Sequence, residues 1–115
     1  MAALTVLLSL LAQTPAADAG RGQRVYEARC IACHSVDVSS VGPAHRGVFG
    51  RRAGSLPGFD YSEALKRSAV VWSAKTLEQW LSGPEKFIPG QKMWFSVSDP
   101  AERRDVIAYL ETLRR

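Results

Sequence analysis

Apolar residues recur at helical spacing in three segments of this chain. The first segment covers about residues 22–33, the second follows Ser73 as far as Leu81, and the third runs from Asp99 to Leu113. Within each segment, apolar side chains return every three or four positions, as they do on one face of an α-helix. The pattern therefore predicts three main helices.

Several residues mark the ends of these helices. Ser73 is a favourable N-cap, and the Gly-Pro pair at 83–84 is expected to end the second helix. Asp99 is the predicted N-cap of the third helix, with Pro100 at its first position. Glu102 stands at the position that completes a capping box.

The rest of the chain is rich in turn-forming residues. Glycine and proline mark turns at positions 42–43, 47, 50, 54, 57–58 and 89–90. A shorter helix is expected over about residues 62–66, and no alternating apolar pattern is long enough for a sheet. The predicted fold class is all-α. Because long loops are unusual in a small domain, we expect them to wrap around an apolar cofactor.

The N-terminal segment has a different character. Residues 2–12 form an apolar run, and the small-residue sequence Ala17-Asp18-Ala19 follows it. This pattern is typical of a secretory signal peptide cleaved after Ala19, and the run is shorter than the roughly 20 residues of a membrane-spanning helix. We expect residues 1–19 to be a signal peptide and residues 20–115 to be one folded domain. A short buried helix is the alternative.

The net charge and the two cysteines limit the chemistry that this chain can carry out. The chain has 15 Lys and Arg residues against 11 Asp and Glu residues, which gives a formal net charge of +4. Export would place its two cysteines in an oxidising compartment. There the thiols would form a disulfide, bind a metal or be alkylated by haem.

The two cysteines belong to the sequence Cys30-Ile31-Ala32-Cys33-His34, a C-x-x-C-H motif. This motif is typical of covalent attachment of a c-type haem, with the adjacent histidine binding the iron. A thioredoxin-like redox pair would need a preceding strand, which is not predicted. A zinc site would need four ligands, and His45 is the only other candidate among Cys and His. A structural disulfide would leave His34 without a role.

Two residues compete for the opposite side of the iron. A thioether or a second imidazole is the usual ligand there. Met93 is the only methionine apart from Met1, and the turn-forming pair Pro89-Gly90 precedes it, which favours a loop. His45 is the alternative ligand. An ordinary packing role is the simpler interpretation for either residue.

Several further motifs occur in a fixed order along the chain. They are Gly22 to Tyr26 before the C-x-x-C-H, Gly42-Pro43 with 47–51 (GVFGR), 57–62 (PGFDYS), Trp72 with Thr76-Leu77, Pro84 through Phe95, and 103–110. In this order the chain resembles a class I cytochrome c, in particular the mitochondrial cytochrome c and bacterial cytochrome c2 group. The resemblance covers nearly all of residues 20–113. It implies a small cytochrome c fold around one haem c.

The resemblance also implies roles for the residues closest to the iron. Cys30 and Cys33 would attach the haem, and His34 and Met93 would be its axial ligands. The carbonyl of Pro43 would accept the other imidazole N–H and so fix the tautomer.

The remaining haem contacts follow from the same resemblance. They are Arg51, Tyr61, Ser62, Trp72, Trp80 and Phe95. Hydrogen bonds to a propionate would come from Tyr61, Ser62 and Trp72, and Arg51 would supply positive charge nearby. Gly22 and Tyr26 would lie where the first and last helices cross, against Val106 and Tyr109.

Three positions depart from the family pattern. Trp80 replaces a tyrosine, Leu65 replaces a common asparagine and His45 replaces a leucine. The lysine-rich surface of the family is also reduced. The basic residues left around the expected haem edge are Arg24, Arg29, Lys86 and Lys92.

Together these features predict an electron-transfer protein rather than an enzyme. We expect a periplasmic monomer that shuttles single electrons between partners with acidic docking surfaces, such as a bc1-type complex, an oxidase or a dehydrogenase. We expect no nucleic-acid ligand and no stable membrane span. The alternative is a dedicated haem c subunit of one exported oxidoreductase complex. A haem peroxidase is a further alternative, and it would require an open sixth position on the iron.

Overall fold

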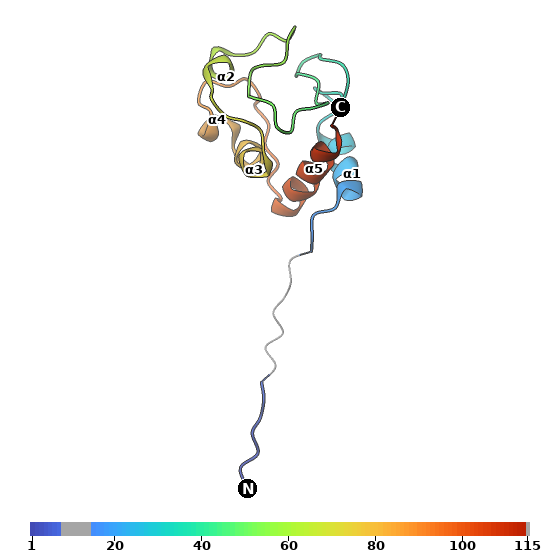
Figure 1. The fold of residues 1–115 in the computed structure, drawn as a ribbon, viewed down its shortest axis with the longest axis vertical. Helices are drawn as coiled ribbons and strands as arrows, with labels where there is room; N and C mark the ends of the chain where they lie inside the picture. Colours follow the sequence, from blue (N-terminus) through green and yellow to red (C-terminus); the bar gives the residue numbers. More distant parts are fainter. Residues whose placement is uncertain (8–14, 115) are drawn as a thin grey trace.

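A computed structural model describes residues 1–7 and 15–114 of the chain. Its elements are α1 (Ala19–Arg29), α2 (Glu63–Arg67), α3 (Ala74–Ser82), α4 (Pro84–Phe87) and α5 (Pro100–Thr112), shown in Figure 1. Long loops join them, and the described residues contain one isolated β-bridge, between Arg52 and Val71, but no strand. The all-α prediction is confirmed.

Helix α1 begins and ends earlier than its sequence pattern predicts. Asp18 caps it, and Arg29 is its last residue. The prediction that the helix continues to Cys33 is wrong because the chain turns at Cys30. The backbone N–H groups of both Cys33 and His34 donate to the Cys30 carbonyl, at 3.2 and 2.9 Å. The C-x-x-C-H motif therefore lies on a tight turn after the helix.

The short helix expected over about residues 62–66 is present as α2, and α3 begins after its predicted cap. Ser62 caps α2, and Ser73 caps α3 in a reciprocal capping box with Thr76. Helix α3 ends at Gly83, as expected. The sequence analysis missed α4, which starts at Pro84, because proline suits the first turn of a helix as well as its end.

Helix α5 begins at Pro100 after the Asp99 N-cap, as predicted. The Asp99 side chain accepts the Ala101 N–H at 2.9 Å. The expected capping-box role of Glu102 is wrong, because its carboxylate accepts from Arg29 of α1 at 3.1 Å. This residue joins two helices instead of capping one.

Helices α1 and α5 cross at close range, as the family resemblance implies (Figure 1). A Cβ on Gly22 would overlap the backbone carbonyl of Asp105 and come within 2.9 Å of the Tyr109 Cβ. Tyr26 and Val106 are buried here, and the Tyr26 and Tyr109 ring centroids are 5.3 Å apart. The missing side chain at Gly22 allows the two backbones to touch.

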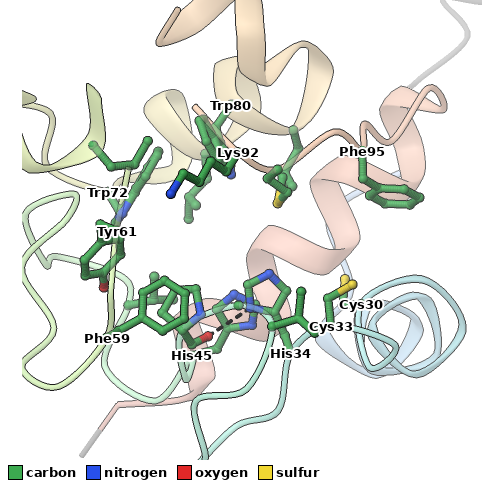
Figure 2. Close-up of a pocket in the computed structure, with 18 of the residues that line it drawn as sticks. Cys30, Cys33, His34, His45, Phe59, Tyr61, Trp72, Trp80, Lys92 and Phe95 are labelled. Atoms are coloured by element: carbon green, nitrogen blue, oxygen red, sulfur yellow. Dashed lines mark hydrogen bonds between the residues drawn. The ribbon is translucent and has the colours of Figure 1, made fainter. Parts of the chain in front are cut away.

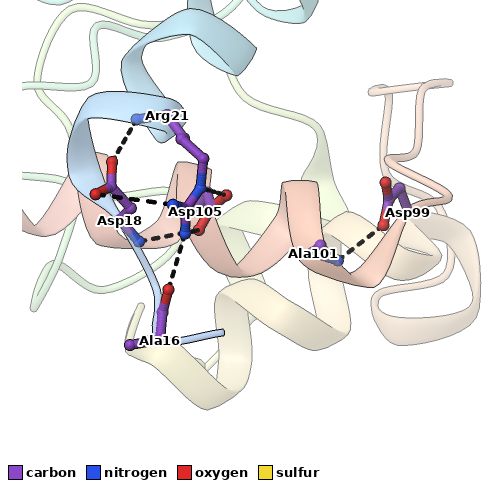
Figure 3. Close-up of polar contacts among 6 residues, drawn as sticks. All are labelled: Ala16, Asp18, Arg21, Asp99, Ala101 and Asp105. Atoms are coloured by element: carbon purple, nitrogen blue, oxygen red, sulfur yellow. Dashed lines mark hydrogen bonds and ion pairs between the residues drawn. The ribbon is translucent and has the colours of Figure 1, made fainter. Parts of the chain in front are cut away.

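A polar network joins the start of α1 to α5 (Figure 3). The buried carboxylate of Asp105 accepts the Asp18 N–H at 2.9 Å and the Arg21 Nε–H at 3.0 Å. Arg21 also donates to the Ala16 carbonyl at 2.9 Å. Cleavage after Ala19 would remove Ala16 and Asp18, and with them the N-cap of α1 and two of these hydrogen bonds, leaving the one from Arg21 Nε to Asp105.

The predicted signal peptide lies partly outside the described residues, which omit 8–14. Residues 1–7 are exposed and have no regular secondary structure. The signal peptide stays a prediction. Among the helices described, none has the length and apolar character needed to cross a bilayer.

Candidate haem site

A cavity of about 440 Å³ lies between the helices and the long loops. Its volume falls within the roughly 300–1,000 Å³ typical of cofactor sites. Every residue of the expected haem-binding set lines it: Cys30, Cys33, His34, Pro43, Arg51, Tyr61, Ser62, Trp72, Trp80, Met93 and Phe95. The three departures from the family pattern, at positions 45, 65 and 80, line it as well.

The His34 ring has a fixed tautomer. Its Nδ1 lies 2.9 Å from the Pro43 carbonyl oxygen. Because a carbonyl only accepts, Nδ1 must carry the proton, and Nε2 keeps the lone pair that a metal requires. Burial lowers the pKa of His34, and the hydrogen bond to Pro43 opposes this effect. Gly42 makes room for the ring, since a Cβ at that position would overlap it.

His45 lies beside His34 rather than across the cavity. The two imidazole rings stack with centroids 4.0 Å apart and planes inclined by 20°. The Tyr26 hydroxyl hydrogen-bonds to His45 Nδ1 at 2.9 Å. Burial, with the nearby charges of His34 and Arg51, lowers the pKa of His45 to about 3, so the ring is neutral.

The facing wall contains Trp80 and Lys92, opposite His34 and His45 in Figure 2. Lys92 directly precedes Met93 in the sequence. His45 is therefore on the wrong side to bind an iron opposite His34. The segment with Met93 is on the facing side.

The loop that carries Met93 is held by side chains that the sequence analysis did not single out for this purpose. The side chain of Gln91, which is buried, accepts the Met93 N–H and donates to Glu85 at 3.2 Å. Glu85 also accepts the Gly90 N–H at 3.1 Å. Through these hydrogen bonds Glu85 braces the loop.

One corner of the cavity presents hydrogen-bond donors. The Tyr61 hydroxyl accepts the Leu56 N–H at 3.2 Å, and the Ser62 hydroxyl accepts the Leu65 N–H at 3.1 Å. Both hydroxyl protons remain available for donation. The indole N–H of Trp72 makes no hydrogen bond within the described part of the chain. Such donors suit a carboxylate, as the expected propionate contacts require.

Arg51 adds positive charge to this cavity. Its two terminal nitrogens donate to the carbonyls of Ala44 and Arg46, at 3.0 and 3.2 Å. These carbonyls hold the guanidinium in place without neutralising it. Burial of the guanidinium lowers the pKa of Arg51.

The cysteines do not resemble a redox pair. Cys30 and Cys33 are both unpaired thiols. Burial, with a smaller effect of Cys33, raises the pKa of Cys30 to about 11, whereas reactive redox cysteines have lowered pKa values. A zinc site has no support either. Over residues 1–7 and 15–114, no three His, Cys, Asp or Glu side chains come together where a metal ion could sit.

One of the basic residues predicted around the haem edge is paired with an acid. Arg29 lines the cavity, but its charge is paired with Glu102 at 3.1 Å. Trp94 and Val41 also line the cavity, and they are 77% and 76% exposed. The sequence analysis missed both residues, because exposure at a loop position leaves no periodic signal.

Comparisons with known proteins identify the family of this chain. The family model for cytochrome c matches residues 19–114. Cytochrome c of Euglena viridis is 44% identical over 100 residues, spanning 84% of this chain and 98% of that protein. Cytochrome c 2.1 of Caenorhabditis elegans is 45% identical over 104 residues, spanning 88% of this chain and 94% of that protein.

A solved structure shares the fold of this chain. Cytochrome cH from Methylobacterium extorquens superposes with a TM-score of 0.79 at 43% sequence identity, covering 83% of this chain and 98% of that one. The residues matched by the family model, 19–114, include the helix crossing and the residues that line the cavity. This chain is therefore a class I c-type cytochrome and belongs to the cytochrome c family.

Proposed function

We propose that this monohaem electron carrier holds its iron between His34 and Met93 and works in the periplasm, where it shuttles single electrons between respiratory or dehydrogenase partners. One observation carries the ligand assignment. His34 has its Nδ1 proton bound to Pro43 at 2.9 Å, and its ring lines the same cavity as Met93.

The residues around the cavity fit a covalent haem c. Cys30 and Cys33 line the cavity next to His34, as thioether formation at the porphyrin requires. The bound haem supplies an iron that gains and loses one electron. Apolar walls and a thioether ligand both favour the reduced, less charged state of such an iron.

The polar residues have a separate task. A haem propionate is an anion, and burying it without partners is costly. Tyr61, Ser62 and Trp72 offer donors, and Arg51 offers charge that backbone carbonyls hold in place. These residues would anchor and orient the cofactor while the iron changes charge.

The periplasmic location and the partners rest on charge and on the N-terminus. The formal net charge of +4 favours docking on acidic surfaces, and that attraction weakens with salt. The apolar N-terminal run supports export through the secretory pathway.

The alternative is a dedicated haem c subunit of one exported oxidoreductase complex. The ion pair between Arg29 and Glu102 and the exposure of Trp94 favour this reading over a purely electrostatic encounter. Gel filtration and pull-down at high salt separate the two. A free monomer supports the carrier, whereas salt-resistant association with one partner supports the subunit.

A visible spectrum of the purified, reduced protein tests the haem and its low-spin state, and Met93→Ala tests the ligand. We expect Met93→Ala to lose the absorption band of methionine bound to ferric iron, to lower the reduction potential and to bind added cyanide or azide. Met93→Leu is the matched control for volume. It should show the same three changes, since it also lacks the sulfur. An unchanged spectrum in both variants would contradict the assignment of Met93 as an iron ligand.

A further inference from the structure

The most unusual contact of the site joins His45 to His34. The family resemblance puts a leucine at position 45, whereas this chain has a second imidazole. The two rings stack with centroids 4.0 Å apart and planes only 20° from parallel. A leucine would fill the space, but it would present no flat face to the His34 ring.

His45 is itself held from the opposite direction. Its Nδ1 lies 2.9 Å from the Tyr26 hydroxyl, and the two rings meet edge to face at 5.5 Å. Tyr26 belongs to α1, is only 3% exposed and packs on Tyr109 of α5. The orientation of the His45 ring is therefore set by the helix crossing.

Two contacts act on different features of the His34 ring. The hydrogen bond from Nδ1 to Pro43 fixes the direction of one ring atom. A ring held at one atom can still rock about that bond, and a parallel neighbour at stacking distance opposes such tilting. Ligand rings that are locked by packing as well as hydrogen bonding keep a narrow range of orientation.

We propose that His45 is a positioning residue that transmits the orientation of Tyr26 to the His34 ring and so sets the plane of that imidazole. This inference rests on the proposed ligation by His34. In low-spin ferric haem, the axial ligand planes determine how the unpaired electron is distributed among the iron orbitals. That distribution is observed in the electron paramagnetic resonance (EPR) g-values and in the spread of the haem methyl proton resonances.

The test compares three variants of the haem-loaded protein with the wild type. His45→Leu removes the stacked ring, and Tyr26→Phe removes the hydroxyl that fixes it. Tyr109→Phe is the matched control, because the Tyr109 hydroxyl makes no hydrogen bond to His45. We expect the g-values and methyl resonances to shift most in His45→Leu and less in Tyr26→Phe, and to stay at wild-type positions in Tyr109→Phe.

Three outcomes would overturn the proposal. One is a folded His45→Leu with wild-type g-values and methyl resonances. Another is an equal shift in Tyr26→Phe and Tyr109→Phe, which would indicate general loosening of the helix crossing. If His45→Leu does not fold, Tyr26→Phe still tests the proposal. Wild-type g-values and methyl resonances in Tyr26→Phe would then be enough to reject it. Failure of the proposed ligation can be told apart from failure of this inference. In the first case the wild type itself would lack the spectrum of an iron bound by histidine and methionine.

Discussion

The helix crossing and the cavity wall are built in opposite ways. Where α1 meets α5, backbone touches backbone at Gly22, and buried side chains fill the space around it. Around the cavity, loops hold single side chains by local bonds, such as Pro43 to His34 and Gln91 to Met93. At the crossing, the side chains of the protein itself fill the interior. The wall surrounds the cavity that the expected haem contacts line.

This difference predicts two kinds of failure. A fault in the crossing should lower the stability of the whole domain, because buried packing contributes most of the free energy of folding. A substitution in the cavity wall should mainly change how the cofactor is held. The contact between Tyr26 and His45 joins the two regions, at 2.9 Å.

The largest loss of stability is expected from Gly22→Ala. The added Cβ would overlap the Asp105 carbonyl, so the helices must move apart. Overpacking of this kind costs about 3 kcal/mol at the upper end of its usual range. Urea unfolding of the haem-loaded protein measures the change.

Gly20→Ala is the matched control on the same helix, and both variants are compared in the uncleaved chain, which keeps Asp18. Its Cβ would meet only the flexible Asp18 side chain, at 3.2 Å. Since alanine favours a helix over glycine by up to about 1 kcal/mol, the control should be neutral or slightly stabilising. Equal losses in the two variants would show that close approach at Gly22 is not the cause.

A smaller loss, with a different signature, is expected from Gly42→Ala in the cavity wall. The Cβ would displace the His34 ring from its hydrogen bond with Pro43. We expect a cost of about 1–3 kcal/mol and a weakened low-spin absorption spectrum. Pro43→Ala keeps the accepting carbonyl and adds no bulk, so it should retain the spectrum. A normal spectrum in Gly42→Ala would contradict the placement of His34.

The smallest effect is expected from Asp105→Asn, and it should depend on pH. The hydrogen bond from Arg21 holds the pKa of Asp105 below its usual value. A lowered folded-state pKa stabilises the protein above the unfolded pKa of about 4, and this contribution is lost as pH falls through the folded value. The difference in unfolding free energy between wild type and variant should be constant from pH 5 to 7 and shrink below about pH 4.

Glu111→Gln provides the control for that experiment. Glu111 is in the same helix and forms an exposed pair with Arg114 at 3.4 Å. Such surface pairs contribute little, so the variant should follow the wild type at every pH. A pH-independent difference for Asp105→Asn would show that its charge is not what matters.

The sequence predicted the parts of the molecule that local chemistry controls. Ser73 and Asp99 are caps because their side chains accept nearby backbone N–H groups, and this needs no tertiary contact. One prediction failed because a distant partner decides: Glu102 pairs with Arg29 across the helix crossing. Another failed locally, because the motif after Arg29 closes a turn on the Cys30 carbonyl instead of continuing the helix.

The candidate site shows the same division. Every expected haem contact lines one cavity, and each was named from a motif that occurs in the family order. Glu85 and Gln91 escaped notice, since each braces the Met93 loop through a partner several residues away. The sequence left His45 as a competing axial ligand, whereas the structure places its ring against the ring of His34.

By itself, the sequence determined the attachment motif, the candidate ligands and the helix caps, because these depend on residue type and short spacing. The tertiary structure alone decided which side of the cavity each ring occupies. It also decided which charges are paired, and how the helix crossing reaches His34 through Tyr26 and His45. Those features depend on how segments far apart in the chain pack together, and no local pattern specifies that.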